Sequence, residues 1–375
     1  MTDHNSKTVA IYSVPKLRCC QLTHRKSFII AICFIFILCI KYVSSQYPLL
    51  VILKWLLMQH NVDHSPFLNV TGKPDVFPDR MPINLTIAYV ADTSLWKEAS
   101  LLYNLIRSES QIDALVVSGD LDYVDQPLAR EHLLTKYFGS KFPIFSCAGN
   151  HDHNFWPKYQ QTILDRWKRS GIHHKCSGII GVAHMCTYKG LIIIQIAPGI
   201  FEKYRFYDYS QYLENQLNLY HSQWKICSWH KNQHNMQLGN KQDETGYDVY
   251  NTCLKHGAMI ITGHEHSYSR TYLMKGLHDP IEVLSRNSTY IQLSNGSSVV
   301  IVNGLGGFSV SGYTNNSIAP YWASVNHANI NGHASALICK YNFNGNMKQA
   351  LCYLKDIVHG KRDQFIIDVT NIPMS

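Results

Sequence analysis

The sequence has little of what a nucleic-acid-binding protein needs. Its formal net charge is +8, but six Lys/Arg against one Asp precede residue 46, which leaves only +3 for the rest of the chain. Beyond this amino-terminal region there is no basic run and no RNA- or DNA-binding motif, and no cysteine pair has zinc-finger spacing. We therefore expect no nucleic-acid partner, with or without zinc.

Internal repeats and low-complexity tracts are also absent, which argues against a solenoid or a disordered chain. The 375 residues are 46% hydrophobic and 16% charged. That balance is typical of a globular protein with a sizeable core, arranged as one large domain or two ordinary ones.

One long apolar run lies near the amino-terminus. Phe28–Ile40 is unbroken over thirteen residues and follows Arg25 and Lys26. Its length is below the ~20 residues that span a bilayer and suits a signal peptide, but the long basic leader and a Lys41 able to snorkel favour an uncleaved anchor. The expected organisation is a basic cytosolic tail (1–27), a transmembrane signal-anchor (28–45), a stem (46–80) and a large folded domain (81–375).

Positive charge before the apolar run predicts a single-pass type II membrane protein of the secretory pathway, with the domain at 81–375 in the lumen or outside the cell. The alternative is secretion after signal cleavage. Five Asn-x-Ser/Thr sites follow the run, at Asn69, Asn84, Asn287, Asn295 and Asn315. Their position agrees with a glycoprotein of this topology.

Seven cysteines follow the apolar run, and an odd number leaves at least one free thiol within the chain. Two local bridges are expected, Cys176 with Cys186 and Cys339 with Cys352. Cys147 and Cys227 lie within predicted core strands, so we expect both to be buried thiols.

Five apolar runs rich in β-branched residues end in residues that bind metals. The residues that follow them are Asp92, Asp120, Asn150, His230, and the pair His264 and His266. Ligands of open α/β sheets bind at the carboxyl ends of the strands, so these side chains are expected to meet at one rim as a metal site. Alternation along a strand end would point His264 and His266 the same way.

Periodicity predicts several other elements. Apolar spacing indicates helices over 96–106 and 212–220, and residues 336–341 and 348–355 are expected as antiparallel strands. Residues 153–184 are expected as loop and helix over the mouth of the site, with solvent-exposed histidines at 153, 173, 174 and 184. The alternation of strands and helices predicts a layered α/β sandwich with mixed sheets.

The ordered blocks Asp92, Gly119-Asp120, Gly149-Asn150-His151-Asp152, His230 and Gly263-His264-Glu265-His266 resemble those of the calcineurin-like metallophosphoesterases. The resemblance covers about residues 83–310 and is greatest to the purple acid phosphatases, including the tartrate-resistant type. It implies a four-layer α/β/β/α sandwich of two mixed β-sheets flanked by helices.

The resemblance also implies a binuclear centre. One metal would take Asp92, Asp120, Tyr123 and His266, and the other Asp120, Asn150, His230 and His264. His151 would stabilise the phosphoryl group or protonate the leaving oxygen, with Asp152 orienting it. His230 and His234 compete for the ligand role, and we expect His230 to bind metal and His234 to reach the substrate phosphate.

Tyr123 distinguishes the purple acid phosphatases from many relatives. Those relatives have a His two residues after the first Asp, where this chain has Ser94. Tyr123 stands three residues after Asp120, and a phenolate suits Fe(III). The expected cofactors are therefore Fe(III) and a divalent metal (Fe, Zn or Mn).

The resulting functional hypothesis is an acid phosphatase that hydrolyses phosphate monoesters of small molecules or phosphoproteins through a metal-activated water. One alternative is another metallophosphoesterase, a phosphodiesterase or nucleotidase with two divalent metals. A second is a catalytically silent surface protein on the same scaffold.

Overall fold

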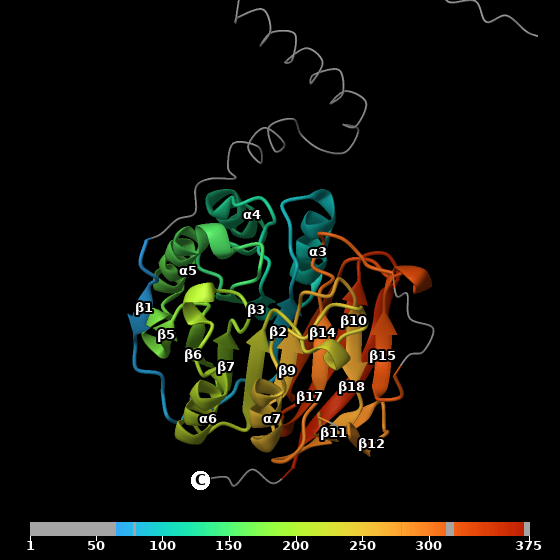
Figure 1. The fold of residues 1–375 in the computed structure, drawn as a ribbon. Coiled ribbons are helices and arrows are strands. Elements are labelled where there is room, and N and C mark those ends of the chain that lie inside the picture. The colour runs from blue at the N-terminus through green and yellow to red at the C-terminus, as the bar shows by residue number, and fades with distance from the viewer. Residues whose placement is uncertain (1–64, 78–79, 279, 313–318, 371–375) are drawn as a thin grey trace, which may run out of the picture. The chain divides into compact units, whose positions relative to one another are not determined.

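Two large mixed β-sheets pack face to face and carry helices on their outer faces (Figure 1). The computed structural model describes residues 65–77, 80–278, 280–312 and 319–370. The predicted tail and signal-anchor lie outside the described residues. Among the residues that are described, no helix is long and apolar enough to cross a membrane.

The seven-stranded sheet has the order β13-β18-β17-β16-β2-β3-β4. Its strands are β2 (Leu85–Val90), β3 (Ile112–Ser118), β4 (Ile144–Cys147), β13 (Tyr290–Leu293), β16 (Ser335–Phe343), β17 (Asn346–Asp356) and β18 (Gly360–Val369). Strands β2, β3 and β4 are parallel, while β16 is antiparallel to β2 and β17. β2 and β4 are buried along their whole length, which explains their continuous apolar sequences.

The nine-stranded sheet has the order β1-β5-β6-β7-β8-β9-β14-β10-β15. Its strands are β1 (Asn69–Thr71), β5 (Cys176–Ile179), β6 (Ala183–Tyr188), β7 (Leu191–Ile196), β8 (Trp224–Trp229), β9 (Met259–Thr262), β10 (Tyr268–Thr271), β14 (Val300–Asn303) and β15 (Trp322–Asn326). Strands β7, β8, β9 and β14 are parallel. A separate pair, β11 (Leu273–Gly276) and β12 (Glu282–Ser285), is antiparallel.

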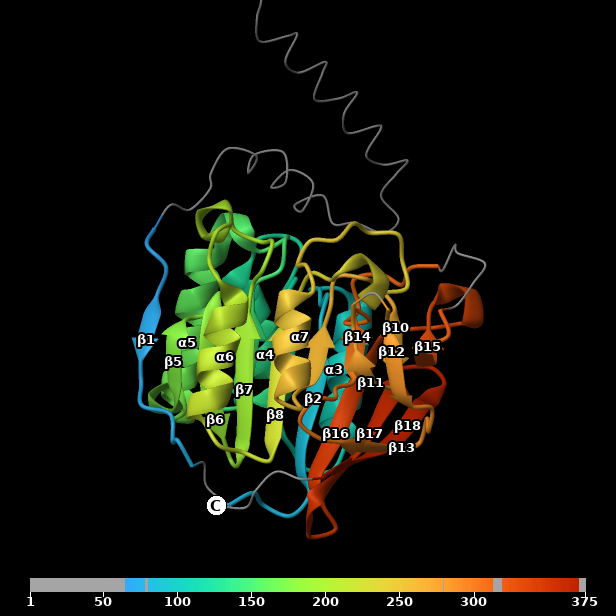
Figure 2. The ribbon, with the colours of Figure 1, turned by 60° about the horizontal axis from the view of Figure 1, so that its bottom comes forward.

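Five α-helices in the described residues form the two outer layers: α3 (Lys97–Ser108), α4 (Pro127–Phe138), α5 (Trp156–Ser170), α6 (Tyr209–Leu219) and α7 (Asp248–Lys255). Five 3₁₀ turns accompany them: His153–Phe155, His173–Lys175, Glu202–Tyr204, His234–Met236 and Ala328–Ile330. Helix α3 packs on β16 and α5 on β4, with α4 between them, whereas α6 and α7 cover the nine-stranded sheet (Figure 2). The predicted four-layer sandwich is confirmed.

Apolar side chains from both sheets form the central core, among them Ile87 and Val116 from one sheet and Ile193 and Ile261 from the other. A second cluster lies between α6, α7 and the outer face of the nine-stranded sheet, and includes Leu213 and Tyr250. Because both faces of the central parallel strands are buried, the polar residues at their ends are held on a rigid support.

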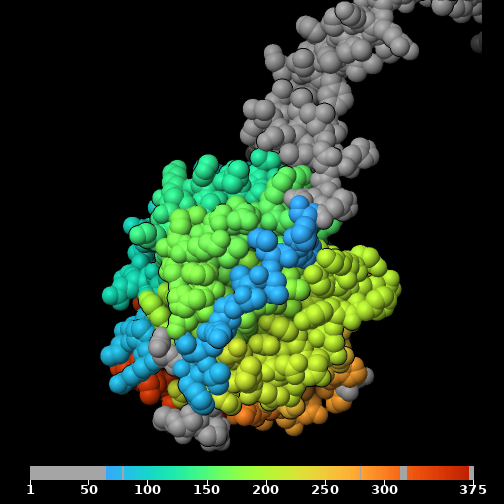
Figure 3. All heavy atoms as spheres, turned by 90° about the vertical axis from the view of Figure 1, so that its left-hand side faces the viewer, coloured from blue at the N-terminus to red at the C-terminus, as the bar shows by residue number. Residues whose placement is uncertain are grey.

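The chain before β2 covers one edge of the nine-stranded sheet. Strand β1 pairs antiparallel with β5, and the Lys73 N–H donates to the carbonyl of His174 at 2.9 Å. Figure 3 shows this segment running across the face of the molecule. Part of the region expected as a stem therefore packs as an edge strand, while the domain boundaries themselves stay a prediction.

The segment 153–184 differs from its sequence prediction. Helix α5 is present, but residues 176–179 and 183–188 form strands, and the prediction of a loop there is wrong. His184 is fully buried in β6, where its Nδ1 accepts a hydrogen bond from the Gly181 N–H at 2.9 Å. Burial lowers the pKa of His184 to about 3, so this side chain is a neutral core residue and not a surface histidine.

The cysteines form three disulfides within the described residues. Cys176–Cys186 and Cys339–Cys352 are confirmed, and both join directly opposed residues of antiparallel strands. Cys147 is a free buried thiol, as expected. The prediction for Cys227 is wrong, because it pairs with Cys253 of α7 and so ties that helix to β8.

Candidate metal centre

The predicted ligands gather at the carboxyl ends of parallel strands from both sheets. Asp92, Asp120 and Asn150 follow β2, β3 and β4 of the seven-stranded sheet. His230 follows β8, and His264 follows β9 of the nine-stranded sheet. Strand polarity thus brings together residues that are far apart in the sequence.

Glycines allow the ligand-bearing loops to approach closely. A Cβ on Gly149 would lie 2.1 Å from Oδ1 of Asp120, and a Cβ on Gly119 would lie 2.7 Å from the His230 ring. Gly119 also has φ +84°, which favours glycine. A Cβ on Gly304 would lie 2.1 Å from the carbonyl of Glu265, so the glycine-rich turn after β14 serves backbone packing.

Three oxygen and nitrogen atoms form a triangle on one side of the centre. The Tyr123 hydroxyl donates to Oδ1 of Asp92 at 2.8 Å and lies 2.8 Å from Nε2 of His266. The remaining edge, between Nε2 of His266 and Oδ1 of Asp92, is 3.2 Å. Ligand atoms about 2.1 Å from one octahedral ion are about 3 Å apart, so this tyrosine triangle (Asp92, Tyr123, His266) has the spacing of a metal-binding set.

A second group, the His230 cluster (Asp120, Asn150, His230, His264), lies beside the triangle. Nε2 of His230 is 3.2 Å from Oδ2 of Asp120 and 3.2 Å from Oδ1 of Asn150. One ligand atom each from Asp120, His230 and His264 lie within 4.8 Å of one another. Nε2 of His230 is also 4.0 Å from Oδ1 of Asp92, which joins the two groups.

Hydrogen bonds on the far side of the rings select which nitrogen faces the centre. Nδ1–H of His230 donates to the carbonyl of Ser118 at 2.9 Å, so Nε2 is the nitrogen that faces the centre and can bind a metal once it has released its proton. Nδ1 of His266 lies 2.5 Å from Oγ of Ser309, which again leaves Nε2 toward the triangle.

His264 departs from the simple strand geometry expected of it. Its φ is +70°, so it lies in a turn and the argument from alternation along an extended strand is wrong. The turn forms because the His264 N–H donates to Oδ2 of Asp92 at 2.8 Å. The His264 side chain still lies in the His230 cluster, although its backbone is in the left-handed conformation.

The same left-handed backbone occurs at three other predicted ligands: Asp92 (φ 58°), Asp120 (φ 51°) and Tyr123 (φ 61°). This conformation is uncommon for residues other than glycine and costs roughly 1–3 kcal/mol each when the surroundings impose it. Among the described residues, four of the eleven non-glycine residues with positive φ are predicted ligands, and backbone strain of this kind is common at functional sites.

The charges in the centre stabilise one another. Burial raises the pKa of Asp120, but the facing His230 outweighs it, so that the pKa of this carboxyl lies well below its usual range. Burial lowers the pKa of His230, while Asp120 and Asp92 raise it to about 9. Burial and the two carboxylates hold the pKa of Tyr123 well above its usual range. Without a cation, protons therefore offset the carboxylate charge, and metal binding would release them.

The predicted catalytic residues lie at the border of the centre. His151 is exposed, its N–H donates to Oδ1 of Asp120 at 2.9 Å, and its ring lies 4.5 Å from the Tyr123 ring. Asp152 does not bind the His151 ring; its two oxygens accept the N–H groups of Leu121 and Gly149, each at 2.8 Å. Asp152 thus holds together the loops that carry Asp120 and Asn150.

His234 lies in an exposed 3₁₀ turn, with Nδ1 2.7 Å from the carbonyl of Lys241. It is not among the residues whose ligand atoms converge with Asp120, whereas His230 is. The alternative that His234 replaces His230 as the ligand is therefore disfavoured by geometry.

Several residues that support the centre carried no sequence signal. Phe308 stacks on Tyr123 with ring centroids 3.5 Å apart and a 4° interplanar angle. Ser309 and Ser118 bind the rings of His266 and His230, and Glu244 binds that of His264. These contacts come from distant loops, and no motif spacing identifies them. Ser94, by contrast, donates to the carbonyl of Gly307 at 2.9 Å and does not face the centre.

The donor set fits a binuclear metal centre. Two buried carboxylates, a phenol, an amide oxygen and histidines with oriented rings are the ligand types that iron, zinc and manganese take in proteins.

Comparison with known proteins agrees with this geometry. The family model for calcineurin-like phosphoesterases matches residues 85–268. The purple acid phosphatase PPD1 from yellow lupin (Lupinus luteus) seeds has the same fold, with a TM-score of 0.58 at 12% identity over 80% of this chain. That match spans 58% of the lupin chain, so much of the latter has no counterpart here.

A structure of PhoD aligns with a TM-score of 0.42 at 11% identity, over 79% of this chain and 73% of that one. No curated protein matches the sequence. The family match over 85–268 and the shared sandwich fold lead to one conclusion: the chain belongs to the calcineurin-like phosphoesterases, a family of metal-dependent hydrolases.

Proposed function

We propose that this protein is an acid phosphatase of the purple type, which hydrolyses phosphate monoesters with Fe(III) and a divalent metal. The observation that supports this most is the tyrosine triangle, in which a phenol oxygen lies 2.8 Å from both a carboxylate oxygen and a histidine nitrogen. A phenol in that position is the ligand that distinguishes iron from two divalent ions.

Asp92, Tyr123 and His266 would hold the iron, and Asn150, His230 and His264 the divalent ion, with Asp120 shared. When bound, the metals would supply Lewis acidity that activates water and stabilises charge on the phosphoryl group. The protein's part is to keep the ligands oriented, through Ser118 for His230 and Ser309 for His266.

His151 and His234 would act on the substrate. The backbone N–H of His151 is used by Asp120, which places its ring at the surface beside the ligands. From there the ring can protonate the leaving ester oxygen as the phosphorus–oxygen bond breaks. Nδ1 of His234 is engaged by the Lys241 carbonyl, and Nε2 would contact a phosphate oxygen.

The proposal includes a lumenal or extracellular catalytic domain on a type II anchor. Three disulfides within one domain favour an oxidising compartment, and the five glycosylation sites after the apolar run agree with that side of the membrane. Substrates would then be phosphate esters or phosphoproteins met outside the cytosol.

Elemental analysis and a visible spectrum of the purified full-length protein test the proposal. We expect near-stoichiometric iron, one divalent ion, a broad purple band, and hydrolysis of p-nitrophenyl phosphate at acidic pH. Two zinc or manganese ions without colour would replace the proposal with a divalent phosphodiesterase or nucleotidase. A folded protein that binds no metal would exclude an enzyme of this kind.

A further inference from the structure

The three histidines of the centre differ in what binds their outer ring nitrogen. His230 is bound by a backbone carbonyl and His266 by a serine hydroxyl, both of which are uncharged. His264 is bound by a carboxylate, since its Nε2 lies 2.9 Å from Oε2 of Glu244. A carboxylate at this position increases the electron density of the imidazole and makes it a stronger ligand.

The polar atoms of His264 are nearly all occupied by the protein. Its N–H donates to Asp92, its carbonyl accepts from Nζ of Lys241, and its Nε2–H donates to Glu244. The remaining ring atom is Nδ1. His264 would therefore present Nδ1 to the centre, while His230 and His266 present Nε2.

Glu244 is held in place for this contact. Its Oε1 accepts from Nζ of Lys231, and its N–H donates to the carbonyl of Asn232 at 3.2 Å. The side chain of Asn232 in turn donates to the carbonyl of Gly263 at 2.6 Å. The loop that carries Glu244 and the turn that carries His264 are thus joined by side-chain and backbone bonds.

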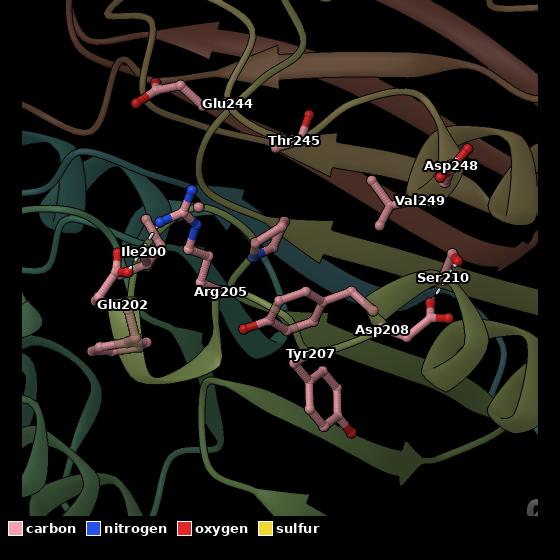
Figure 4. Close-up of a pocket in the computed structure, with 14 residues that line it drawn as sticks. Ile200, Glu202, Arg205, Tyr207, Asp208, Ser210, Glu244, Thr245, Asp248 and Val249 are labelled. Carbon is pink, nitrogen blue, oxygen red and sulfur yellow. Dashed lines mark hydrogen bonds and ion pairs between the residues drawn. The ribbon is translucent and has the colours of Figure 1, made fainter.

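Glu244, which binds His264, also lines a cavity of about 440 Å³. Figure 4 shows this cavity, which Arg205, Tyr207, Asp208 and Asp248 also line. Asp248 has the same charge and lines the same cavity, but it is exposed and lies at the start of α7. It offers a matched control for the loss of one carboxylate.

We propose that Glu244 is a positioning residue that holds His264 with Nδ1 toward the His230 cluster and strengthens binding of the metal there. The inference rests on the proposed binuclear centre. In this role Glu244 raises the affinity for the metal and does not itself contact the reacting atoms.

The test compares zinc binding by the full-length wild type, Glu244→Gln and Asp248→Asn. Each metal-free protein is titrated with zinc against a chelator, and the bound zinc is counted. We expect Glu244→Gln to bind one zinc as the wild type does and the other about 10–100-fold more weakly, because outer partners of ligand histidines have effects of this size. Asp248→Asn should bind both normally.

The number of zinc ions bound distinguishes a positioning role of Glu244 from a general structural role. A misfolded variant would lose both ions, whereas loss of a positioning contact weakens one. Circular dichroism and the unfolding temperature of the metal-free forms confirm that Glu244→Gln folds. Two zinc ions bound to Glu244→Gln as tightly as to the wild type would overturn this inference alone, and a wild type that binds no metal would overturn the proposed function itself.

Discussion

The tyrosine triangle and the His230 cluster are adjacent, yet their side chains are held in different ways. His230 is fully buried and bound to the carbonyl of Ser118, and Asp120 receives a backbone N–H from the loop after β4. In the triangle, Asp92 accepts the backbone N–H of His264, but the rings of Tyr123 and His266 are supported by side chains of one loop after β14, Phe308 and Ser309.

The two kinds of support suggest separate origins for the binding of metal and for the choice of metal. Ligands held by strand ends and backbone atoms depend on the sheet, which is the shared scaffold of the phosphoesterases. The triangle depends on Tyr123, Phe308 and Ser309, which loop changes can alter without disturbing the sheet. Metal binding would therefore depend mainly on the strand ends, with Glu244 strengthening it, while the choice of iron would depend on the loop after β14.

Replacement of the shared ligand should affect both groups and have the largest effect. We expect Asp120→Asn to lose both metals and to reduce kcat/KM by more than about 100-fold, beyond the usual effect of an outer partner. Bound metal and the rate with p-nitrophenyl phosphate measure this. Asp113→Asn, at the other end of β3, removes a surface ion pair with Lys189 and should keep the activity. An active Asp120→Asn variant would show that the tyrosine triangle and the His230 cluster do not depend on a shared Asp120 carboxylate.

Tyr123→Phe should affect the triangle and spare the His230 cluster. We expect loss of the visible band, about one metal retained, and activity reduced at least about tenfold, since the hydroxyl that contacts Asp92 and His266 is removed. The visible spectrum and metal content of the variant report the result. An unchanged spectrum would mean that the phenol is not a ligand.

Gly149→Ala tests whether the close packing of the loop after β4 against Asp120 is needed for metal binding. A Cβ there would lie 2.1 Å from Oδ1 and 2.2 Å from the backbone nitrogen of Asp120, so the loop must move. We expect about 1–3 kcal/mol less stability together with weaker metal binding. Urea unfolding measures the first and zinc titration the second. In Gly276→Ala the added Cβ would have its nearest neighbour at 3.3 Å, in the Glu282 side chain, and this variant should change neither quantity by a comparable amount.

Phe308→Ala should have the smallest effect of these variants, and only the tyrosine triangle should change. The stacked pair with Tyr123 is worth about 0.5–1.5 kcal/mol beyond its buried area. We expect a stability loss of about that size and a shifted visible band, with the zinc affinity of the His230 cluster unchanged. Phe206→Ala is the control, because that ring is 92% exposed. Equal effects of the two variants would contradict a supporting role for the stack.

Most of the metal ligands could be predicted from the order of the sequence motifs. Asp92, Asp120, Asn150 and His230 each follow a buried apolar run, and these runs did form parallel strands whose ends converge. The missed elements were those with weak periodicity or few apolar residues, including α4, α7 and β18. Their amphipathic patterns are short, and their formation depends on packing against the sheets.

Some residues were misassigned because local sequence does not specify burial. His184 is a polar residue among Ala, Met and Cys, and only the pairing of β6 with β5 and β7 encloses it. Cys227 was expected as a thiol because its partner Cys253 lies 26 residues away on a helix that was not predicted. Asp152 was assigned to His151 as its neighbour in sequence, whereas the fold directs it to two backbone N–H groups.

By itself, the sequence determined the order of the strands that end in ligands, the ligand types and the resemblance to a metal-dependent phosphoesterase, because hydrophobic periodicity and motif spacing are local properties. Only the tertiary structure decided which ring nitrogen faces the centre, how Phe308, Ser309 and Glu244 support the ligands, and where the charges offset one another. Those properties depend on contacts between residues up to 185 positions apart, as between Tyr123 and Phe308, and such contacts exist only once the sheets have packed.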